Sequence, residues 1–397
     1  RPQVDRRLWL QTTNRIEAKA EKTYKGQDKP VIIFSLNDFR NAQIDYPSTF
    51  TDLYQAKVKD KPSPDSHQLR AIDDVVAGLQ TSDRGQMIMA CGTGKTFTTL
   101  WIKEALNAKT TLVLLPSLSL LSQTMREWVW AGNSDFEVLN VCSDKSVGKK
   151  TEDMAPSDAP FAVTSEVSEI SRFLLKLGPR VVFCTYQSSK LIAEAQSDAE
   201  VPTFDLVIAD EAHRCAGMAD AGFATILDGE KIRAAKRLFT TETPRYFGKA
   251  IKDASKANDV VVVGMDDEMV FGPVIHQLTF GQAIQDELLN DYQVVIVGVN
   301  ELMVKQWIDN YEIVATNPDE TTDARTLAAK IGMLKAVKDY DLKRMISFHS
   351  RVSTARKFSE ELLEVANLIE PSNRPKGTFL ADYVSGEMKA GDRKEKI

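Results

Sequence analysis

The chain has 397 residues, of which 43% are hydrophobic and 27% are charged, and its formal net charge is −6. This is long enough for two or three domains, with the composition of a soluble globular protein. The negative net charge argues against a chain that coats nucleic acid by bulk charge, although fifty Lys and Arg residues could still form a local basic groove. The longest apolar stretch, 111–121, is interrupted by Pro116 and by serines, so we expect no membrane partner.

The cysteines and the first residues indicate the compartment and the completeness of the chain. No CxxC pair and no Cys/His metal spacing is present among the four cysteines, which are Cys91, Cys142, Cys184 and Cys215. We therefore predict reduced thiols and a cytoplasmic protein, and we find no secretory signal. The chain begins RPQVDRR without a methionine, so we expect a fragment or a trimmed product.

Two short strands are predicted near the amino terminus, RLWLQTT at 7–13 and PVIIFSL at 30–36. Between them, Asn14 followed three residues later by Glu17 is typical of a helix start. This βαβ-like piece is too small to be a whole domain. The segment KDKPSPDS at 59–66 contains two prolines and polar spacers, which predicts a linker.

From His67 onward, short apolar runs alternate with helical segments such as 96–108 and 166–177. The runs are rich in Val, Ile and Leu without polar alternation, which is typical of strands buried on both faces of a parallel sheet. This pattern predicts an open α/β sheet, and the polar segment 143–158 is predicted to be a surface loop. The predicted strands are 86–89, 111–115, 136–141, 180–184, 204–209, 236–240 and 260–264.

A second alternation begins at residue 292 and predicts a second α/β lobe that the end of the chain cuts short. Its last residues, GDRKEKI, read as the start of a helix. Strands are expected at 292–299, 344–348 and 378–384, and helices at 324–338 and 354–366.

The segment MACGTGKT combines an apolar run, a glycine-rich turn and a predicted helix. Gly92 and Gly94 would let the backbone turn tightly around phosphate oxygens. Lys95 would reach the β- and γ-phosphates, and the Thr96 hydroxyl would coordinate Mg²⁺. The strict pattern GxxxxGK[ST] has glycine where this chain has Met89, so the bland alternative is a glycine-rich turn with solvated Lys and Thr side chains.

A second part of the same site is predicted where the run FDLVIA ends in Asp210 and Glu211. Asp210 would hold the metal ion, and Glu211 would orient and deprotonate the attacking water. Two acids after a strand are often only a helix start, but here they follow Lys95 by 115 residues in the same predicted sheet. ATP is the expected nucleotide, because an NKxD stretch typical of guanine specificity is lacking.

The motifs MACGTGKT, VIADEAH and TTETP resemble, in order and spacing, those of superfamily 2 (DEAH-box) helicases and translocases. The resemblance covers the chain from about Asp65 to its end. It implies an α/β fold with two RecA-like parallel-sheet lobes, the second one incomplete. It also implies ATP and Mg²⁺ as cofactors and nucleic acid as partner.

The resemblance assigns expected roles to residues of several matching motifs. The catalytic residues are expected to be Lys95, Asp210 and Glu211, with Mg²⁺ held by Thr96 and Asp210. The nucleotide would be bound by Gln68, which matches the glutamine that reads adenine, and by Gly92, Thr93, Gly94, Lys95 and Thr96. DNA contact or coupling is expected of Pro116, Ser117, Thr185, Gln187, His213, Thr241, Thr243, His349 and Arg351.

Further motifs resemble the motors of type I-like (type ISP) restriction-modification enzymes and related large predicted helicases. These motifs are TYQSS, TPRYF and FGPVIHQLTFGQAIQDELLNDYQVVIV. The resemblance implies a double-stranded DNA translocase, whose nuclease, methyltransferase and target-recognition domains lie elsewhere in the polypeptide. The expected domains are the tail of a Mrr-like nuclease or coupling segment at 1–58, a first lobe at 59–275 and a truncated second lobe at 276–397. No D…ExK nuclease set occurs at 1–55.

Two departures from the family bear on activity. Glu242 stands where the family has a small residue, and a carboxylate pointing toward the phosphates would weaken anion binding. The chain also ends before the later motifs with their arginine fingers, which are worth ~10³–10⁵ in rate. We therefore expect slow ATP hydrolysis in this chain.

Several alternatives stay open at this stage. Thr185, Gln187 and Ser188 could cap the helix that follows a buried strand. His349 and Arg351 could form structural salt bridges instead of contacting phosphate. For the whole chain, the alternatives are a strand-separating DNA or RNA helicase and a nucleotide-gated DNA-binding module without net motion.

Overall fold

The computed structural model describes residues 7–13, 20, 23, 31–34, 36–40, 42–142, 163–218, 224–248, 262–297 and 321–368, with single positions and short runs between 374 and 396. The chain divides into two compact units, 1–291 and 292–397. The helix start predicted at Asn14 and the loop predicted at 143–158 lie outside the described residues. None of the helices that the structure describes is both long and apolar enough to cross a membrane.

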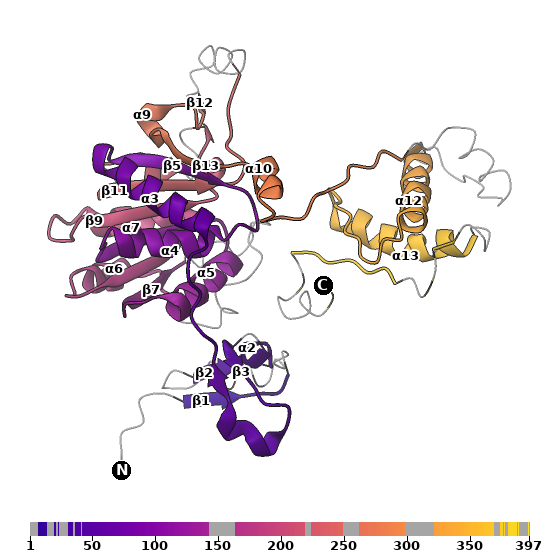
Figure 1. Ribbon diagram of the computed structural model, residues 1–397, viewed down its shortest axis with the longest axis horizontal. Helices are drawn as coiled ribbons and strands as arrows, with labels where there is room; N and C mark the ends of the chain where they lie inside the picture. The colour runs from indigo at the N-terminus through magenta and orange to yellow at the C-terminus, as the bar shows by residue number, and fades with distance from the viewer. Residues whose placement is uncertain are drawn as a thin grey trace. The chain divides into compact units, whose positions relative to one another are not determined.

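Within its described residues, the first unit is built around a seven-stranded sheet (Figure 1). All neighbouring strands are parallel, which confirms the predicted α/β class with a parallel sheet. In spatial order, the strands are β13 (Val274–Leu278), β5 (Arg84–Met89), β11 (Ala234–Thr241), β9 (Phe204–Asp210), β6 (Thr110–Leu115), β8 (Arg180–Thr185) and β7 (Glu137–Val141).

One strand of this sheet differs from the prediction. The run 260–264 was expected to join the sheet, but its described part is the two-residue strand β12 (Val262–Val263), which pairs antiparallel with β10 (Gly217–Met218). The edge position beside β5 is taken by β13 instead. The β13 sequence VIHQL carries polar residues because an edge strand is partly solvated, so it lacks the apolar run that marks the other strands.

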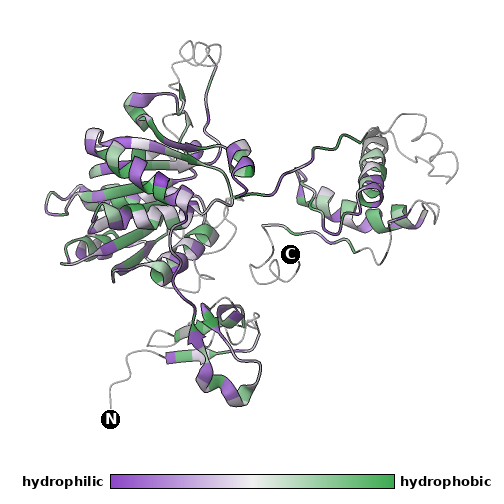
Figure 2. Cartoon of the chain, in the orientation of Figure 1, coloured by the Kyte–Doolittle hydropathy of each residue, from purple (hydrophilic) through white to green (hydrophobic). Residues whose placement is uncertain are grey.

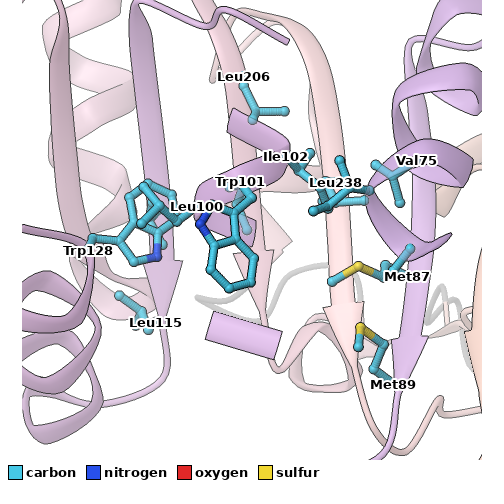
Figure 3. Packing of buried hydrophobic residues seen from close by; sticks show 14 of the residues in the cluster. Val75, Met87, Met89, Leu100, Trp101, Ile102, Leu115, Trp128, Leu206 and Leu238 are labelled. Atoms are coloured by element: carbon cyan, nitrogen blue, oxygen red, sulfur yellow. The ribbon is translucent and has the colours of Figure 1, made fainter. Parts of the chain in front are cut away.

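The sheet buries a separate hydrophobic cluster on each face, because successive side chains of a strand point to opposite sides. In β6, Val113 and Leu115 belong to one cluster, and Leu112 and Leu114 belong to the other. The first cluster includes residues of the helices α3 (Ser66–Thr81), α4 (Lys95–Ala105) and α5 (Leu118–Ala131) (Figure 3). The second includes residues of α6 (Val167–Leu174) and α7 (Ser189–Gln196).

The distribution of hydropathy follows from this layering. The strands of the sheet are largely hydrophobic, whereas the helices mix hydrophobic and hydrophilic residues (Figure 2). A helix that covers a sheet buries only one stripe of its surface. Short elements complete the unit: η4 (Tyr186–Ser188), η5 (Ala212–Arg214), η6 (Ala224–Leu227), α9 (Glu268–Phe271) and α10 (Phe280–Gln285).

Trp128 of α5 connects the first cluster to the helix that follows the glycine-rich loop. Its side chain is 0% exposed, its ring packs edge-on against Phe183 at 5.6 Å, and its Nε1 donates to the Thr96 carbonyl oxygen at 3.0 Å. We expect Trp128→Ala to lower the free energy of unfolding by ~3–5 kcal/mol, because it leaves a large cavity. Urea denaturation measures the loss.

The neighbouring residue supplies the matched control for this prediction. Val129 is 58% exposed, so Val129→Ala is expected to change the free energy of unfolding by less than ~0.5 kcal/mol. Equal effects of the two substitutions would show that Trp128 is not a core residue.

The amino-terminal segment contains two small sheets. Strands β1 (Arg7–Leu10) and β2 (Val31–Phe34) pair in parallel, which confirms the two strands predicted there. Strands β3 (Ile44–Asp45) and β4 (Lys57–Val58) pair antiparallel. The helices α2 (Leu36–Arg40) and η1 (Phe50–Gln55) complete it. The predicted linker is irregular from residue 59 until α3 begins at Ser66.

The second unit contains the two predicted helices, α12 (Thr321–Asp339) and α13 (Val352–Leu368). They pack through a small cluster formed by Ile331, Leu334, Phe358, Leu362 and Val365. The expected strands are absent from the described residues at 292–297, 344–348 and 380–384. Ile296 and Phe348 are 92% and 94% exposed; a parallel strand needs a hydrogen-bonded neighbour, which apolar sequence alone does not provide.

The unit boundary also bears on the domain prediction. The structure divides the chain after residue 291, and β13 runs across the boundary that we expect at 275/276. This strand belongs to the sheet of the first unit, because it pairs with β5. The assignment of domains by function remains a prediction.

Candidate active site

The topology of the sheet brings three motifs to one edge. Strand β11 lies between β5 and β9, and Thr240 and Thr241 of β11 are in register with Asp210 of β9 and Ile88 of β5. All three strands are parallel, so their carboxyl ends lie at the same edge, which is where open α/β sheets bind ligands. The glycine-rich loop, the Asp-Glu pair and the segment after Thr241 therefore meet there.

The glycine-rich loop has the backbone that its sequence predicts. Gly92 and Gly94 have φ values of 84° and 82°, in the left-handed region that favours glycine. A Cβ on Gly94 would also clash with the Gln68 Nε2. Gly94 is the N-cap of α4, whose first N–H groups lack intrahelical partners and, with the helix dipole, favour an anion.

Lys95 lies among carboxylates at this edge. Its Nζ is 3.9 Å from Glu211 Oε1 and 3.8 Å from Glu242 Oε2. It also donates to the Met89 carbonyl oxygen at 3.3 Å. The structure thus brings together the predicted lysine and the predicted acidic motif, and it turns Glu242 toward the loop.

Asp210 is held by one residue of the neighbouring strand β11 and by one residue of η4. Thr240 Oγ1 of β11 donates to Asp210 Oδ1 at 2.7 Å, and the Tyr186 hydroxyl donates to the Asp210 backbone oxygen at 2.6 Å. Burial raises the pKa of Asp210, while the Thr240 hydrogen bond and Lys95 act in the opposite direction. Thr240 and Tyr186 were not among the predicted site residues, although TTETP and TYQS contain them.

Glu211 combines a strained backbone with an unsatisfied carboxylate oxygen. Its φ is 52°, which is uncommon for a residue with a Cβ and occurs most often at functional sites. Burial raises its pKa, and so does the neighbouring Asp210. Oε2 is buried without a hydrogen-bond partner, although His213 Nδ1 lies 3.3 Å away. A carboxylate of raised pKa can accept a proton from a bound water.

His213 joins the acidic motif to the end of β11. Its Nδ1 lies 2.9 Å from Thr241 Oγ1, which also accepts a hydrogen bond from the Thr243 backbone nitrogen at 3.2 Å. Burial lowers the pKa of His213, as does the nearby Arg214, so the neutral imidazole is favoured. This contact connects the segment after β9 to the segment after β11.

Gln68 supports the glycine-rich loop from α3. Its Oε1 accepts from the Asp65 backbone nitrogen at 2.9 Å, and its Nε2 lies 3.4 Å from the carbonyl oxygens of Thr93 and Gly94. His67 Nε2 lies 3.0 Å from the same Thr93 oxygen. Because Gln68 already bonds to protein at both ends of its amide, adenine contact by this residue stays a prediction.

The hydroxyl groups expected to touch DNA in the first unit take part in local structure. Ser117 caps α5, since its Oγ accepts from the Leu120 nitrogen at 3.3 Å. Thr185 is fully buried, and its Oγ1 donates to Ser188 Oγ at 3.0 Å. Neither Thr185 nor Ser188 accepts a side-chain capping bond from the helix that follows it. Gln187 Oε1 is buried without a partner.

Pro116 and Thr243 flank the candidate edge at the ends of β6 and β11, and Pro116 is buried. In the second unit, His349 Nε2 lies 2.9 Å from Ser347 Oγ. The His349 ring is 4.7 Å from that of Phe358, and Arg351 is exposed just before α13. DNA contact by these residues remains a prediction.

Two family models match the chain. Residues 61–246 match the family described as "Type III restriction enzyme, res subunit". Residues 1–56 match a family described as "Restriction endonuclease". Both lie in the first unit, and the larger match covers the glycine-rich loop, the Asp-Glu pair and Glu242.

Solved structures and curated proteins give concordant similarities. The structure titled "ATP-dependent Type ISP restriction-modification enzyme LlaBIII bound to DNA" matches 100% of this chain and 27% of its own, with a TM-score of 0.76 and 27% identity. A nuclease-deletion mutant of the type ISP enzyme LlaGI, in complex with a DNA substrate mimic, matches 77% of this chain and 21% of its own, with a TM-score of 0.54 and 30% identity.

Among curated proteins, "Probable helicase A859L" of African swine fever virus (isolate Tick/Malawi/Lil 20-1/1983) is 27% identical over 310 residues. The chain spans 32% of that relative and 27% of the LlaBIII chain. These matches confirm the predicted α/β class with RecA-like, helicase-type architecture. They also confirm the predicted resemblance: the chain contains a superfamily 2 helicase-like region and is similar to the motors of type I-like (type ISP) restriction-modification enzymes.

Proposed function

We propose that the chain is the motor part of a restriction enzyme, an ATP-dependent translocase on double-stranded DNA. The observation that carries the proposal is the meeting of Lys95, Asp210 and Glu211 at the carboxyl edge of one parallel sheet. The similarity to type ISP enzymes supports DNA as the partner, since the LlaBIII title names both ATP and DNA. In this proposal, nuclease, methyltransferase and target-recognition domains belong to the same longer polypeptide, which acts in the cytoplasm.

The residues at this edge fit a magnesium–ATP complex. Positive φ at Gly92 and Gly94 shapes a loop for phosphate oxygens, and the Glu211 Oε2 is a buried acceptor that lacks a partner. Thr96 and Asp210 would hold Mg²⁺, and Lys95 would contact the phosphates. When bound, the nucleotide would supply the phosphoryl group that passes to water, with ADP as the leaving group, and Mg²⁺ and Lys95 would stabilise the charge that develops.

The protein groups have distinct roles in this proposal. Glu211 accepts the proton of the attacking water, and the Thr240 hydroxyl keeps Asp210 in place. His213 couples a change in the position of the acidic motif to Thr241, through the contact between its Nδ1 and the Thr241 hydroxyl. Contacts of protein hydroxyl and amide groups with the phosphates of the DNA backbone carry no sequence information. Such contacts suit movement along DNA of any sequence.

A triplex-displacement assay tests the translocation part of this proposal. A third strand bound to duplex DNA should be released by the chain in an ATP-dependent manner, while a partial duplex with single-stranded tails should stay paired. A slow release is expected, because ATP turnover is expected to be slow.

The rival functions give different results in the same pair of assays. Separation of the partial duplex would identify a strand-separating helicase. DNA binding that depends on nucleotide, without release of either strand and without DNA-stimulated ATP hydrolysis, would identify a nucleotide-gated binding module.

A further inference from the structure

At the edge where β5, β9 and β11 end, carboxylates surround the Lys95 ammonium group. Lys95 Nζ has Glu211 at 3.9 Å and Glu242 at 3.8 Å, and Asp210 is close enough for Lys95 to lower its pKa. Burial and Asp210 raise the pKa of Glu211, Glu242 adds to this rise, and Lys95 and Arg214 oppose it. Two glutamate carboxylates thus pair with Lys95 and a third carboxylate, Asp210, lies nearby, so Lys95 does not offer a free positive charge to an incoming phosphate.

Glu242 reaches across the glycine-rich loop. It directly follows Thr241, the last residue of β11, and β11 is the strand between the two motifs. Its carboxylate forms the ion pair with Lys95 and is close enough to Cys91 to raise the pKa of that thiol. Cys91 and Lys95 flank the segment 92–94, so the carboxylate interacts with residues on both sides of the two positive-φ glycines. The side chain is 32% exposed, which leaves it room to move outward.

We propose that the Glu242 carboxylate occupies the place on Lys95 that a nucleotide phosphate takes, so that nucleotide binding must displace it. The inference rests on the proposed nucleotide site and adds a built-in competitor to it. Metal-free ATP meets the full repulsion of the three carboxylates, whereas Mg²⁺ neutralises part of it. The displaced residue is joined directly to Thr241, whose hydroxyl contacts His213, so nucleotide entry moves the segment that links the two motifs.

Equilibrium binding of a fluorescent ATP analogue tests this inference in the absence of turnover. Glu242→Gln keeps the size of the side chain and removes its charge. We expect the affinity for the metal-free analogue to rise about tenfold, and that for the magnesium complex to rise less, since Mg²⁺ neutralises part of the repulsion and solvent partly screens the pair. The matched control is Glu230→Gln, an exposed residue before the opposite end of β11, which should leave both affinities unchanged.

Cys91 provides a second readout that needs no nucleotide. It is exposed, whereas the other three cysteines are buried, and the nearby Glu242 carboxylate, which can accept from the thiol, raises the pKa of Cys91. Because the thiolate is the reactive form, Glu242→Gln should speed the alkylation of Cys91 by iodoacetamide at pH ~8 several-fold. Mass spectrometry of the peptide that contains Cys91 measures the rate, and Glu230→Gln should not change it.

The two measurements separate the possible failures. If the wild-type chain binds nucleotide but Glu242→Gln changes neither affinity nor alkylation rate, the competitor role is wrong and the nucleotide site stands. If alkylation speeds up but no variant binds nucleotide, the proposed nucleotide site is wrong, and the competitor role fails with it. A rise in both quantities, confined to Glu242→Gln, supports the inference.

Discussion

Replacing Lys95 with methionine is expected to weaken nucleotide binding by about 100-fold or more. A charge-assisted hydrogen bond to phosphate is worth ~1.5–3 kcal/mol. The substitution also leaves Glu211 and Glu242 without the ammonium group that lies 3.9 Å and 3.8 Å from them. Titration with a fluorescent ATP analogue in the presence of Mg²⁺ measures the change.

The control for this prediction removes an exposed lysine of the same unit that is not among the candidate site residues. Lys190 is exposed on α7, so Lys190→Met should bind nucleotide as the wild type does. Thermal unfolding of Lys95→Met should also show a folded chain, because the substitution keeps an unbranched side chain. A Lys95→Met variant that is folded and binds nucleotide with unchanged affinity would contradict the assignment of the phosphate loop.

Glu211→Gln is expected to slow the chemical step and to leave nucleotide binding nearly intact. Loss of a general base costs ~10²–10⁴ in rate, and the burial that raises the pKa of Glu211 suits it to take up a proton. The neutral amide keeps the size of the side chain and lessens the repulsion of phosphate. Single-turnover hydrolysis of radiolabelled ATP, with enzyme in excess, separates the rate of the chemical step from binding.

A second glutamate with the same backbone conformation provides the matched control. Glu287 has a φ of 56°, close to the 52° of Glu211, but it is exposed. Glu287→Gln therefore tests the effect of the amide at a left-handed position, without a change in the active site. Equal hydrolysis rates for Glu211→Gln and the wild type would show that another group takes the proton.

The parallel sheet was predictable because its central strands are buried on both faces. Runs such as TLVLL and FDLVIA cannot alternate with polar residues when both sides are covered, and six of the seven predicted runs became strands of the sheet. β13 was not found by this criterion, since His276 and Gln277 interrupt its apolar pattern. The run 260–264 was wrongly assigned to the parallel sheet. Its high β-propensity predicts a strand, but propensity does not decide which other strand it pairs with.

The second unit shows the same limit of local sequence more strongly. Its helices were predicted correctly because a helix satisfies its own backbone hydrogen bonds. Strands depend on neighbours that are often far away in sequence, and 344–348 forms no strand in the structure despite an apolar sequence. Periodicity therefore predicts helices from local sequence, whereas strand assignments need knowledge of the pairing.

The candidate site was partly predictable, because the loop and the acidic pair carry their own sequence patterns. The direction of Glu242 was not, since it depends on the position of β11 between β5 and β9. The same holds for Tyr186, whose hydroxyl supports Asp210 from a neighbouring segment. The buried hydroxyl of Thr185 could not be read from its motif either, because burial is a property of the packed sheet.

The most direct test of the central claim is an experimental structure of the chain with Mg²⁺ and a non-hydrolysable ATP analogue. The account predicts that the Lys95 ammonium group contacts the phosphates, that the metal ion lies beside the Thr96 hydroxyl and Asp210, and that Glu242 has moved away from Lys95. A nucleotide bound elsewhere, with Lys95 still paired to both glutamates, would contradict it.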